Sequence, residues 1–455
     1  MAQYDLIIIG GGPAGYNAAE RAAHGGLKTL LIEKNALGGV CLNKGCIPSK
    51  TLLNSAKMYD HALHSAKYGV TAENVKIDQE KVVERKCNVV NMLVSGVTGK
   101  MRRAKVKVVK AAAEILGKTA EGFEVKANDE VFSGKNLLVT TGSTAVVPPI
   151  PGLREGIGTG FVVTNHEIFD VKQIPEKLVV IGGGVIGLEM ASYFCSVGSK
   201  VTIIEMLDHI AGATDSEIAK LLQDTYAKKG VEFKLGCKVT AVEAGKVIYE
   251  QNGAAMEAPA DLVLCSIGRR AVTQGIGLEN IGVYMERGAV KTDEQMRTNI
   301  SGVYAAGDVN GVSMLAHTAY REGEVAVNTI LGKPDRMRYT AIPGVIYTNP
   351  EVASVGLTLE QAKEKGFDAD VVKMTALASG RYVAENEGGN GFCKVVYDKK
   401  YNRVLGVHMI GGYPSESIYG ASMMIETEMR IENLKEIVFP HPTVCEVIRE
   451  ALFEI

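Results

Sequence analysis

One local plan occurs twice in this chain and restricts it to folds built around parallel β-sheets. Each copy has an apolar run, a glycine-rich turn, a helix-like stretch with small residues, a second apolar run and a glutamate. The copies are residues 4–33 and 178–205. The continuous apolar runs 6–9 and 178–181 are typical of strands buried on both faces. We therefore predict two βαβ nucleotide-binding units in an α/β protein.

Both turns carry the G-x-G-x-x-G fingerprint of dinucleotide-binding proteins. Such glycines allow a tight turn, close approach of the backbone to a pyrophosphate and close packing of helix on strand, while the helix N-terminus supplies N–H donors. A turn of this kind also occurs in α/β proteins that bind nothing, but the placement of strand, helix and acid favours binding. The residues are Gly10, Gly12, Gly15 and Glu33 in the first copy and Gly182, Gly184, Gly187 and Glu205 in the second.

The acid of the second copy indicates which dinucleotide binds there. A carboxylate at the ribose edge accepts hydrogen bonds from a free 2′-hydroxyl and repels a 2′-phosphate. The residues after Glu205 are Met206, Leu207 and Asp208, which offer no cation to such a phosphate. The sequence therefore favours NAD over NADP.

Composition excludes several classes of protein. The chain has 455 residues, 46% apolar and 22% charged, with a net charge of −2, as in ordinary globular proteins of two or three domains. The near-neutral charge predicts no binding to nucleic acid, and no apolar run is long enough for a membrane span. Only eight cysteines are present, and a strand begins almost at residue 1, leaving no room for a signal or transit peptide. We expect a cytoplasmic protein.

Breaks in the pattern divide the chain into four segments. Three prolines and a glycine in 148–152 follow a strand-like run, and a turn-rich stretch begins near residue 270. From 341 onward, β-rich runs alternate with helical patterns, which predicts a separate α+β domain. The predicted segments are 1–147, 148–270, 271–340 and 341–455.

Two cysteines, Cys41 and Cys46, follow the first fingerprint in the run GGVCLNKGCIPSK. They have three interpretations: a metal site two ligands short, two unrelated buried cysteines, or a redox-active disulfide beside a bound cofactor. A disulfide requires Cα atoms within about 7 Å, which a bent helical turn can provide. Lys50, four residues after Cys46, can stabilise a thiolate or a reduced cofactor by its charge.

A late histidine can supply the base that a dithiol reaction needs. His441 lies between two prolines, and Glu446 follows five residues later, placed to accept the other ring N–H. Taken alone, His441 would be a surface-loop residue; beside a thiol pair, a general base is favoured. The other six cysteines have no assigned role: Cys445 is interpreted as a small core side chain, and single buried residues are predicted for Cys87, Cys195, Cys237, Cys265 and Cys393.

Together these motifs resemble the flavin-dependent pyridine nucleotide-disulfide oxidoreductases over the whole chain. The resemblance implies two Rossmann-like domains that bind FAD and NAD, followed by an α+β dimerisation domain from about residue 341. Residues 1–147 and 271–340 would form the FAD-binding domain in two parts, and 148–270 the NAD-binding domain. Val40 departs from the family pattern, which usually has threonine before the first cysteine.

The resemblance also implies the roles of individual residues. Lys50 and Glu189 would lie beside the flavin ring, and Cys41, Cys46, His441 and Glu446 would be catalytic. The FAD contacts would be Gly10, Gly12, Gly15, Glu33, Ala113, Thr141, Gly142, Ser143, Asp308, Met314, Leu315, Ala316 and His317. The NAD-lining positions would be Gly182, Gly184, Gly187, Glu205, Val239 and Gly268. No resident metal is expected.

Within this family the IPSK ending of the thiol motif and Glu205 favour the branch that oxidises dihydrolipoyl groups with NAD+. The expected partners are a second copy of the chain and a lipoyl-bearing protein, from a 2-oxo acid dehydrogenase complex or from the glycine cleavage system. The alternative is an NAD(P)H-dependent reductase of another disulfide or of a metal ion. The base would come from the neighbouring subunit, so His441 would serve Cys41 and Cys46 across a two-fold interface.

Overall fold

The first fingerprint lies in a seven-stranded sheet of the computed structural model, which describes residues 3–386 and 388–455. In sheet order its strands are β3 (Lys107–Lys110), β2 (Thr29–Glu33), β1 (Tyr4–Ile9), β6 (Glu130–Val139), β5 (Gly122–Ala127) and β4 (Ala113–Thr119), with β19 (Val303–Ala305) also paired to β6. β1, β2, β3, β6 and β19 pair in parallel, whereas β4 and β5 form an antiparallel extension. Leu6, Ile7 and Ile8 of the central β1 are fully buried, as expected for a strand covered on both faces.

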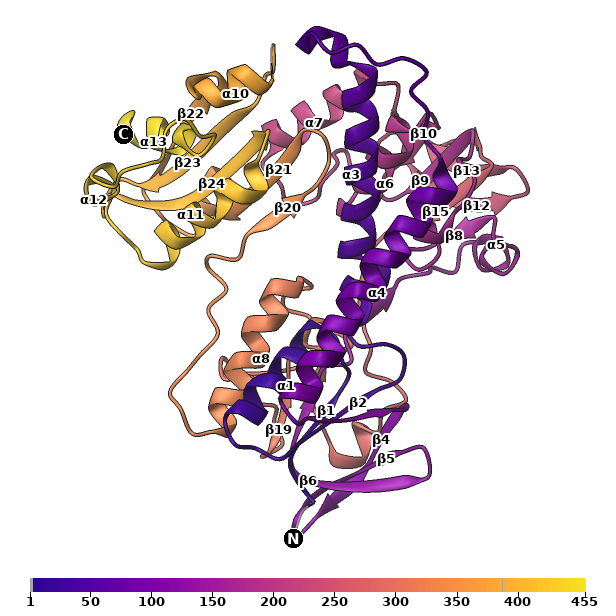
Figure 1. Ribbon diagram of the computed structural model, residues 1–455, viewed down its shortest axis with the longest axis vertical. Helices are drawn as coiled ribbons and strands as arrows, with labels where there is room; N and C mark the ends of the chain where they lie inside the picture. The colour runs from indigo at the N-terminus through magenta and orange to yellow at the C-terminus, as the bar shows by residue number, and fades with distance from the viewer. Residues whose placement is uncertain (1–2, 387) are drawn as a thin grey trace.

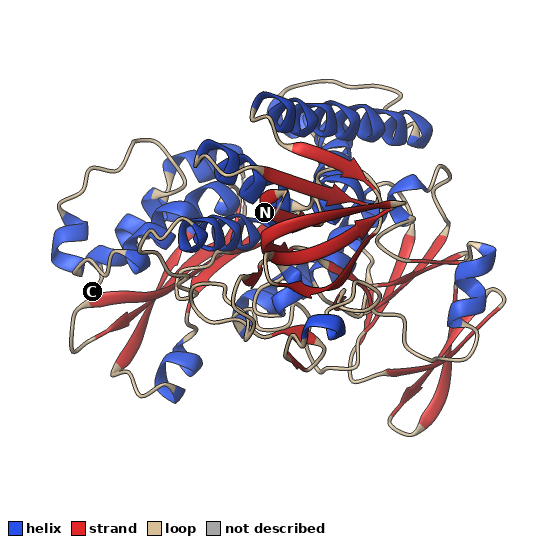
Figure 2. Ribbon diagram, turned by 90° about the horizontal axis from the view of Figure 1, so that it is seen from below, coloured by secondary structure: helices blue, strands red, loops and turns tan. Residues whose placement is uncertain are grey.

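Helices from distant parts of the chain cover this sheet or lead away from it toward the second domain. They are α1 (Pro13–His24), α2 (Gly39–Lys44), α3 (Cys46–Leu63), α4 (Gln79–Arg103) and α8 (Ala316–Ile330). α1 and α8 pack side by side, and Figure 1 shows the long α3 and α4 extending from this region toward the second domain. In Figure 2 a group of strands lies beside the N-terminal label near the centre of the molecule, with helices next to it. The contact between α1 and α8 is close at Gly323, where an added Cβ would lie 2.8 Å from the Ala14 carbonyl oxygen.

The second fingerprint lies in a parallel five-stranded sheet. Its strands, in order, are β11 (Glu232–Lys234), β10 (Lys200–Ile204), β9 (Lys177–Ile181), β15 (Leu262–Cys265) and β8 (Val162–Val163), and its helices are α6 (Val185–Ser196) and α7 (Ser216–Lys228). An antiparallel sheet of β12 (Lys238–Glu243), β13 (Lys246–Gln251) and β14 (Ala254–Pro259) adjoins it. Eight consecutive residues of α6, Gly187 to Phe194, are buried, because α6 lies between this sheet and α3.

The C-terminal part forms an antiparallel five-stranded sheet with helices against it. The strands, in order, are β20 (Gly344–Ile346), β21 (Glu351–Gly356), β24 (Arg403–Gly411), β23 (Phe392–Asp398) and β22 (Ala369–Thr375). α11 (Pro414–Glu426) contacts β21 and β24, and α13 (Glu446–Phe453) contacts β22 and β23 (Figure 1). The predicted fold class, two Rossmann-like domains and a C-terminal α+β domain, is confirmed.

Shorter elements connect these sheets. The 3₁₀ helices are η1 (Ser65–Tyr68), η2 (Ile168–Asp170), η3 (Glu279–Ile281), η4 (Asp308–Asn310) and η5 (Ala376–Ala378). The remaining strands and helices are β7 (Ser143–Ala145), β16 (Arg269–Ala271), β17 (Met285–Glu286), β18 (Ala289–Val290), α5 (Leu153–Thr159), α9 (Leu359–Glu364), α10 (Gly380–Glu385) and α12 (Ile431–Lys435). Throughout the described residues, no helix combines the length and apolar character needed to cross a membrane.

The close contact between α1 and α8 makes a prediction about stability. Gly323→Ala should force the helices apart and lower the free energy of unfolding by about 1–3 kcal/mol, the usual effect of overpacking. Gly96→Ala is the matched control, because Gly96 is also helical, is exposed and has open space at its Cβ position. The control should gain about 0.5–1 kcal/mol from helix propensity alone. The midpoint of thermal unfolding should therefore fall in Gly323→Ala and not in Gly96→Ala; equal midpoints would contradict the packing argument.

Candidate active site

The two cysteines of the early motif form a disulfide at a break between two helices. α2 ends at Lys44, α3 begins at Cys46, and the Cα atoms of Cys41 and Cys46 are 4.6 Å apart. Gly45 lies in the break, and a Cβ there would be only 3.1 Å from the Val40 carbonyl oxygen. A glycine therefore allows the backbone to turn tightly enough for the sulfurs to meet. The pair is bonded, so the interpretation as two unrelated cysteines is wrong.

The first fingerprint forms a backbone cradle at the N-terminus of α1. Gly10 has φ +108°, and a Cβ there would lie 2.3 Å from the Thr140 carbonyl oxygen. A Cβ on Gly15 would lie 1.9 Å from the Gly10 carbonyl oxygen, so only glycine lets α1 approach β1 this closely. At Gly12, the N-cap of α1, a Cβ would project into nearly open space. This open, donor-rich helix N-terminus fits a pyrophosphate group.

The second fingerprint repeats this geometry at α6. Gly182 has φ +104°, and a Cβ on Gly187 would lie 2.2 Å from the Gly182 carbonyl oxygen. Gly184, the N-cap of α6, has no heavy atom within 4 Å of its Cβ position. Both turns thus fit dinucleotides, with room for the phosphates where a side chain would otherwise stand.

The acids of the two units are held in the same way. Glu33 accepts hydrogen bonds from the N–H of Gly11 at 2.7 Å and of Asn35 at 2.7 Å. Glu205 accepts hydrogen bonds from the N–H of Gly183 at 2.6 Å and from the N–H of Leu207 at 2.8 Å. These bonds fix each carboxylate at the end of its second strand, and the remaining lone pairs can accept hydrogen bonds from ribose hydroxyls.

An ion pair joins the two nucleotide-binding units beside the disulfide. Lys50 Nζ, one helical turn after Cys46, lies 2.8 Å from Glu189 Oε1 and 2.9 Å from Oε2. The Glu189 side chain is only 5% exposed and also accepts the Tyr347 N–H at 3.1 Å. Lys50 Nζ lies 4.2 Å from the centroid of the Tyr347 ring, a cation–π contact that the sequence did not predict.

A polar network lies between the first sheet and the second. Ser143 donates a short hydrogen bond to Asp308, and Arg269 donates from Nε to Ser143 Oγ at 2.8 Å and from Nη2 to the Ser143 carbonyl at 2.9 Å. Burial lowers the pKa of Arg269, and the nearby Asp308 carboxylate opposes that shift. The network brings together Ser143 and Asp308, which are 165 residues apart. Arg269 was not predicted as a site residue.

The other predicted cofactor contacts occupy varied positions. Thr141 donates to the Val272 carbonyl at 2.6 Å, and Gly142 has φ +72°. Met314 and Leu315 are exposed before α8, whereas Ala113 and Val239 are buried in β4 and β12. Ala316 begins α8, Gly268 follows β15 with φ +137°, and burial lowers the pKa of His317. No contact in the described chain tests these cofactor roles, which stay predictions.

The late histidine and glutamate form a hydrogen-bonded pair at the start of α13. His441 Nδ1 lies 2.9 Å from Glu446 Oε1, and Glu446 Oε2 accepts the Thr443 N–H at 2.8 Å. The Thr443 N–H, followed by His441, lowers the pKa of the Glu446 carboxyl, so it is ionised and accepts the Nδ1 hydrogen. Nε2 is then the ring nitrogen able to take a proton. The His441 side chain is 77% exposed, and among the described residues no hydrogen bond or ion pair links it to either redox cysteine.

The remaining cysteines are less uniform than expected. Cys237, Cys265 and Cys393 are buried, and burial raises the pKa of all three thiols. Cys87, however, is exposed on α4, so its predicted burial is wrong. Only one side of the long helix α4 is covered by the rest of the protein, and the identity of one residue does not indicate which side of the helix it lies on.

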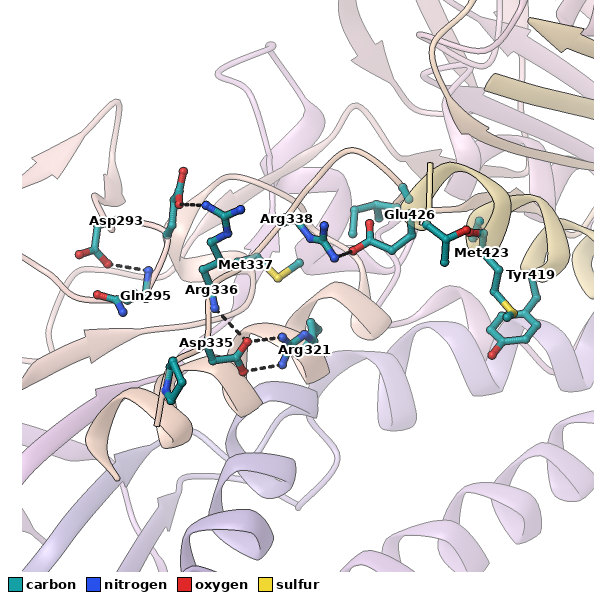
Figure 3. Close-up of a pocket in the computed structure, with 16 residues that line it drawn as sticks. Asp293, Gln295, Arg321, Asp335, Arg336, Met337, Arg338, Tyr419, Met423 and Glu426 are labelled. Atoms are coloured by element: carbon teal, nitrogen blue, oxygen red, sulfur yellow. Dashed lines mark hydrogen bonds and ion pairs between the residues drawn. The ribbon is translucent and has the colours of Figure 1, made fainter. Parts of the chain in front are cut away.

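A cleft of about 1010 Å³ lies elsewhere, between the chain after α8 and helix α11. Figure 3 shows its charged residues paired with one another: Arg321 with Asp335 and Arg338 with Glu426. None of the predicted site residues lines it. Most of its charged side chains are thus paired within the cleft.

Comparison with known proteins agrees with this geometry. Residues 4–323 match the model of the pyridine nucleotide-disulphide oxidoreductases, and residues 342–452 match the dimerisation domain of the same family. A mitochondrial dihydrolipoyl dehydrogenase of Pisum sativum is 39% identical, covering 98% of this chain and 90% of the relative. A dihydrolipoyl dehydrogenase of Bacillus subtilis is 39% identical, covering 98% and 95%. The solved structure of the HOCl-induced flavoprotein disulfide reductase RclA from Escherichia coli has a TM-score of 0.87 at 27% identity, covering 99% of each chain.

The chain therefore belongs to the pyridine nucleotide-disulphide oxidoreductase family. It is an enzyme of this class, in which FAD and NAD(H) are the cofactors, and many of its relatives are dihydrolipoyl dehydrogenases. The matched dimerisation domain supports a homodimer.

The position of Glu205 predicts coenzyme preference. We expect Glu205→Ala to lower kcat/KM for NAD by about ten- to hundredfold, because charge-assisted hydrogen bonds to the ribose are lost. The ratio of kcat/KM for NAD to kcat/KM for NADP should fall as well. Glu232→Ala is the control. Glu232 is an exposed residue of β11 in the same sheet, and its substitution removes the same negative charge. The measurement is steady-state kinetics with both coenzymes. Equal efficiency with NAD and NADP in the unmodified protein would contradict the assignment.

Proposed function

We propose that this enzyme is a dihydrolipoyl dehydrogenase, which oxidises protein-bound dihydrolipoyl groups to the disulfide and delivers the electrons to NAD+. The observation that carries the proposal is the Cys41–Cys46 disulfide, one helical turn from the Lys50–Glu189 ion pair that joins the two dinucleotide cradles. Full-length likeness to proteins of that name supports it. The first cradle, with Gly10, Gly12, Gly15 and Glu33, would hold FAD, which would supply an acceptor for two electrons from a dithiol and a hydride donor to NAD+.

The side chains of this protein carry out the sulfur chemistry. His441 takes the proton from one substrate thiol at Nε2, and Glu446 holds the ring and stabilises its protonated form. The substrate thiolate attacks Cys41 Sγ, and the Cys41–Cys46 bond breaks as Cys46 leaves as a thiolate. The second substrate thiol then displaces Cys41. The substrate loses two electrons and two protons, and the protein disulfide becomes a dithiol.

A nearby positive charge favours the sulfur anion that forms in this step. Lys50 lies on α3 one turn from Cys46, and its ammonium group is fixed by Glu189 and Tyr347 rather than free to turn away. Because the Glu189 side chain is buried, the ion pair keeps a defined position between the two units. We infer that Lys50 and Glu189 set the electrostatic environment between the disulfide and the cofactor sites.

The proposed partners are a second copy of the chain and a lipoyl-bearing protein of a 2-oxo acid dehydrogenase complex or of the glycine cleavage system. We propose a cytoplasmic location, supported by a single disulfide beside six free cysteines among the described residues. A second candidate function is reduction of another disulfide or of a metal ion with NAD(P)H, which the likeness to RclA favours.

A direct assay separates the two functions. The purified enzyme should form NADH from NAD+ and free dihydrolipoamide, whereas Cys41→Ser should not, because it lacks the sulfur that the substrate attacks. The comparison panel uses NADH or NADPH with glutathione disulfide, cystine and Cu(II). Faster turnover of a panel member than of dihydrolipoamide would replace the first function by the second.

The exposure of His441 leads to a prediction about how two subunits form the active site. We propose that His441 of the partner subunit serves the Cys41–Cys46 pair, so each active site draws on both chains. Either His441→Ala or Cys41→Ser should be severe, since losing a general base costs about 10²–10⁴-fold in rate. Mixing the two inactive variants through a denaturation and refolding step should restore activity, because one site of the mixed dimer then has an intact thiol pair and an intact base.

The control for this experiment is each variant refolded alone, which should remain inactive. The mixed dimer is isolated with two different affinity tags before it is assayed. If it has no more activity than its parents, the base and the thiols belong to one chain, and the shared-site proposal fails while the sulfur chemistry stands.

A further inference from the structure

The peptide between the two redox cysteines is held from outside its own helices. Lys44 is the last residue of α2, between Cys41 and Cys46, and its carbonyl oxygen accepts a hydrogen bond from Asn165 Nδ2 at 2.8 Å. Asn165 is only 4% exposed and comes from the segment between β8 and β9 of the second sheet. The contact therefore joins the redox motif to a segment 121 residues away.

The same segment also holds the side chain of Lys44. Lys44 Nζ lies 2.6 Å from Asp170 Oδ2 at the end of η2. The other oxygen of Asp170 pairs closely with Lys86 of α4, whose side chain is 5% exposed. Lys44 is thus fixed at both its carbonyl and its ammonium group by residues five positions apart, Asn165 and Asp170.

The segment that does the holding is itself fixed. Arg269 Nη1 donates to Asn165 Oδ1 at 3.0 Å while its Nε donates to Ser143 at 2.8 Å. At the other end of the segment, the buried Gln79 donates to the Val171 carbonyl at 2.8 Å. Asn165 therefore uses both ends of its amide, accepting from a fixed guanidinium and donating to Lys44.

We propose that Asn165 is a positioning residue that keeps Cys41 and Cys46 together after their disulfide is reduced. The inference rests on the proposed function only in taking this pair as the redox centre. Once the S–S bond is broken, Gly45 is the only covalent link between the ends of α2 and α3, and the hydrogen bond to the Lys44 carbonyl adds to their packing in restraining the thiols from moving apart. A restrained dithiol re-forms its disulfide more favourably, because less chain freedom is lost on closure.

The test measures the thiol–disulfide equilibrium of the full flavin-loaded protein in anaerobic dithiothreitol buffers. Reduced dithiothreitol gives two electrons and two protons to the protein disulfide, whose S–S bond breaks, and becomes the cyclic disulfide. The reaction is quenched with acid, free thiols are alkylated, and mass spectrometry gives the reduced fraction of the Cys41–Cys46 pair. This readout requires neither dihydrolipoamide nor NAD.

Asn165→Ala should shift this equilibrium toward the dithiol by about three- to tenfold, the size expected for one hydrogen bond. This corresponds to a reduction potential about 15–30 mV less negative. Asparagine and alanine are both uncharged, so the substitution does not change the net charge near the thiolate. Asn165→Ser should shift the thiol–disulfide equilibrium in the same direction, because the serine hydroxyl is too short to reach both Arg269 and Lys44. This variant replaces Asn165→Ala if the alanine variant fails to fold.

Asn299→Ala is the matched control. Asn299 also uses both ends of its amide, donating to the Gly282 carbonyl at 2.9 Å and accepting the Tyr284 N–H at 2.8 Å, but neither hydrogen bond involves the redox motif, residues 41–46. Its equilibrium should equal that of the unmodified protein. An unchanged equilibrium in the Asn165 variants, a shift toward the disulfide, or an equal shift in the control would overturn the proposal. A shift in a protein that does not oxidise dihydrolipoamide would leave the inference standing and remove the proposed function.

Discussion

The ion pair between Lys50 and the buried Glu189 is the constraint on which the candidate active site depends. Its two residues follow the two motifs that carry the chemistry: Lys50 lies one turn after the disulfide, and Glu189 two residues after the last glycine of the second fingerprint. A carboxylate that is 5% exposed needs a counter-charge, because burying it alone would be very unfavourable. Together with the apolar packing of α3 on α6, the pair therefore holds the disulfide in place relative to both dinucleotide cradles.

The second constraint is the close packing of the backbone at the N-termini of α1 and α6. Gly15 and Gly187 let α1 and α6 lie directly against their strands, and Gly10 and Gly182 let the turns double back. Any side chain at these positions would collide with a carbonyl oxygen within 3 Å. The glycines thus set the shape of the sites, while the acids at the strand ends and the ion pair set their charge.

Much of this architecture could be predicted because its signals are local. The fingerprints, the acids at their fixed spacing and the cysteine motif each lie within about 30 residues, and the histidine and glutamate are five residues apart. The contacts of Asn165, Arg269 and Tyr347 could not be predicted, because each joins segments that are distant in sequence and carries no spacing rule. Likewise, the exposure of Cys87 depends on how α4 is covered, which tertiary packing decides.

The order of the chain bears on how the protein is made. β19 pairs with β6 at Val303 and Leu137, and α8 packs on α1, so the first sheet is completed only by residues that follow the whole second sheet. During synthesis the N-terminal strands emerge early, but β19 and α8, which complete and cover their sheet, emerge much later. The second sheet, by contrast, is formed by one continuous stretch of chain from β8 to β15. Such long sequence separation slows folding and leaves apolar surface exposed in the meantime. The first fingerprint, in residues 10–15, therefore reaches its final surroundings only after residues that follow the whole second sheet have been made.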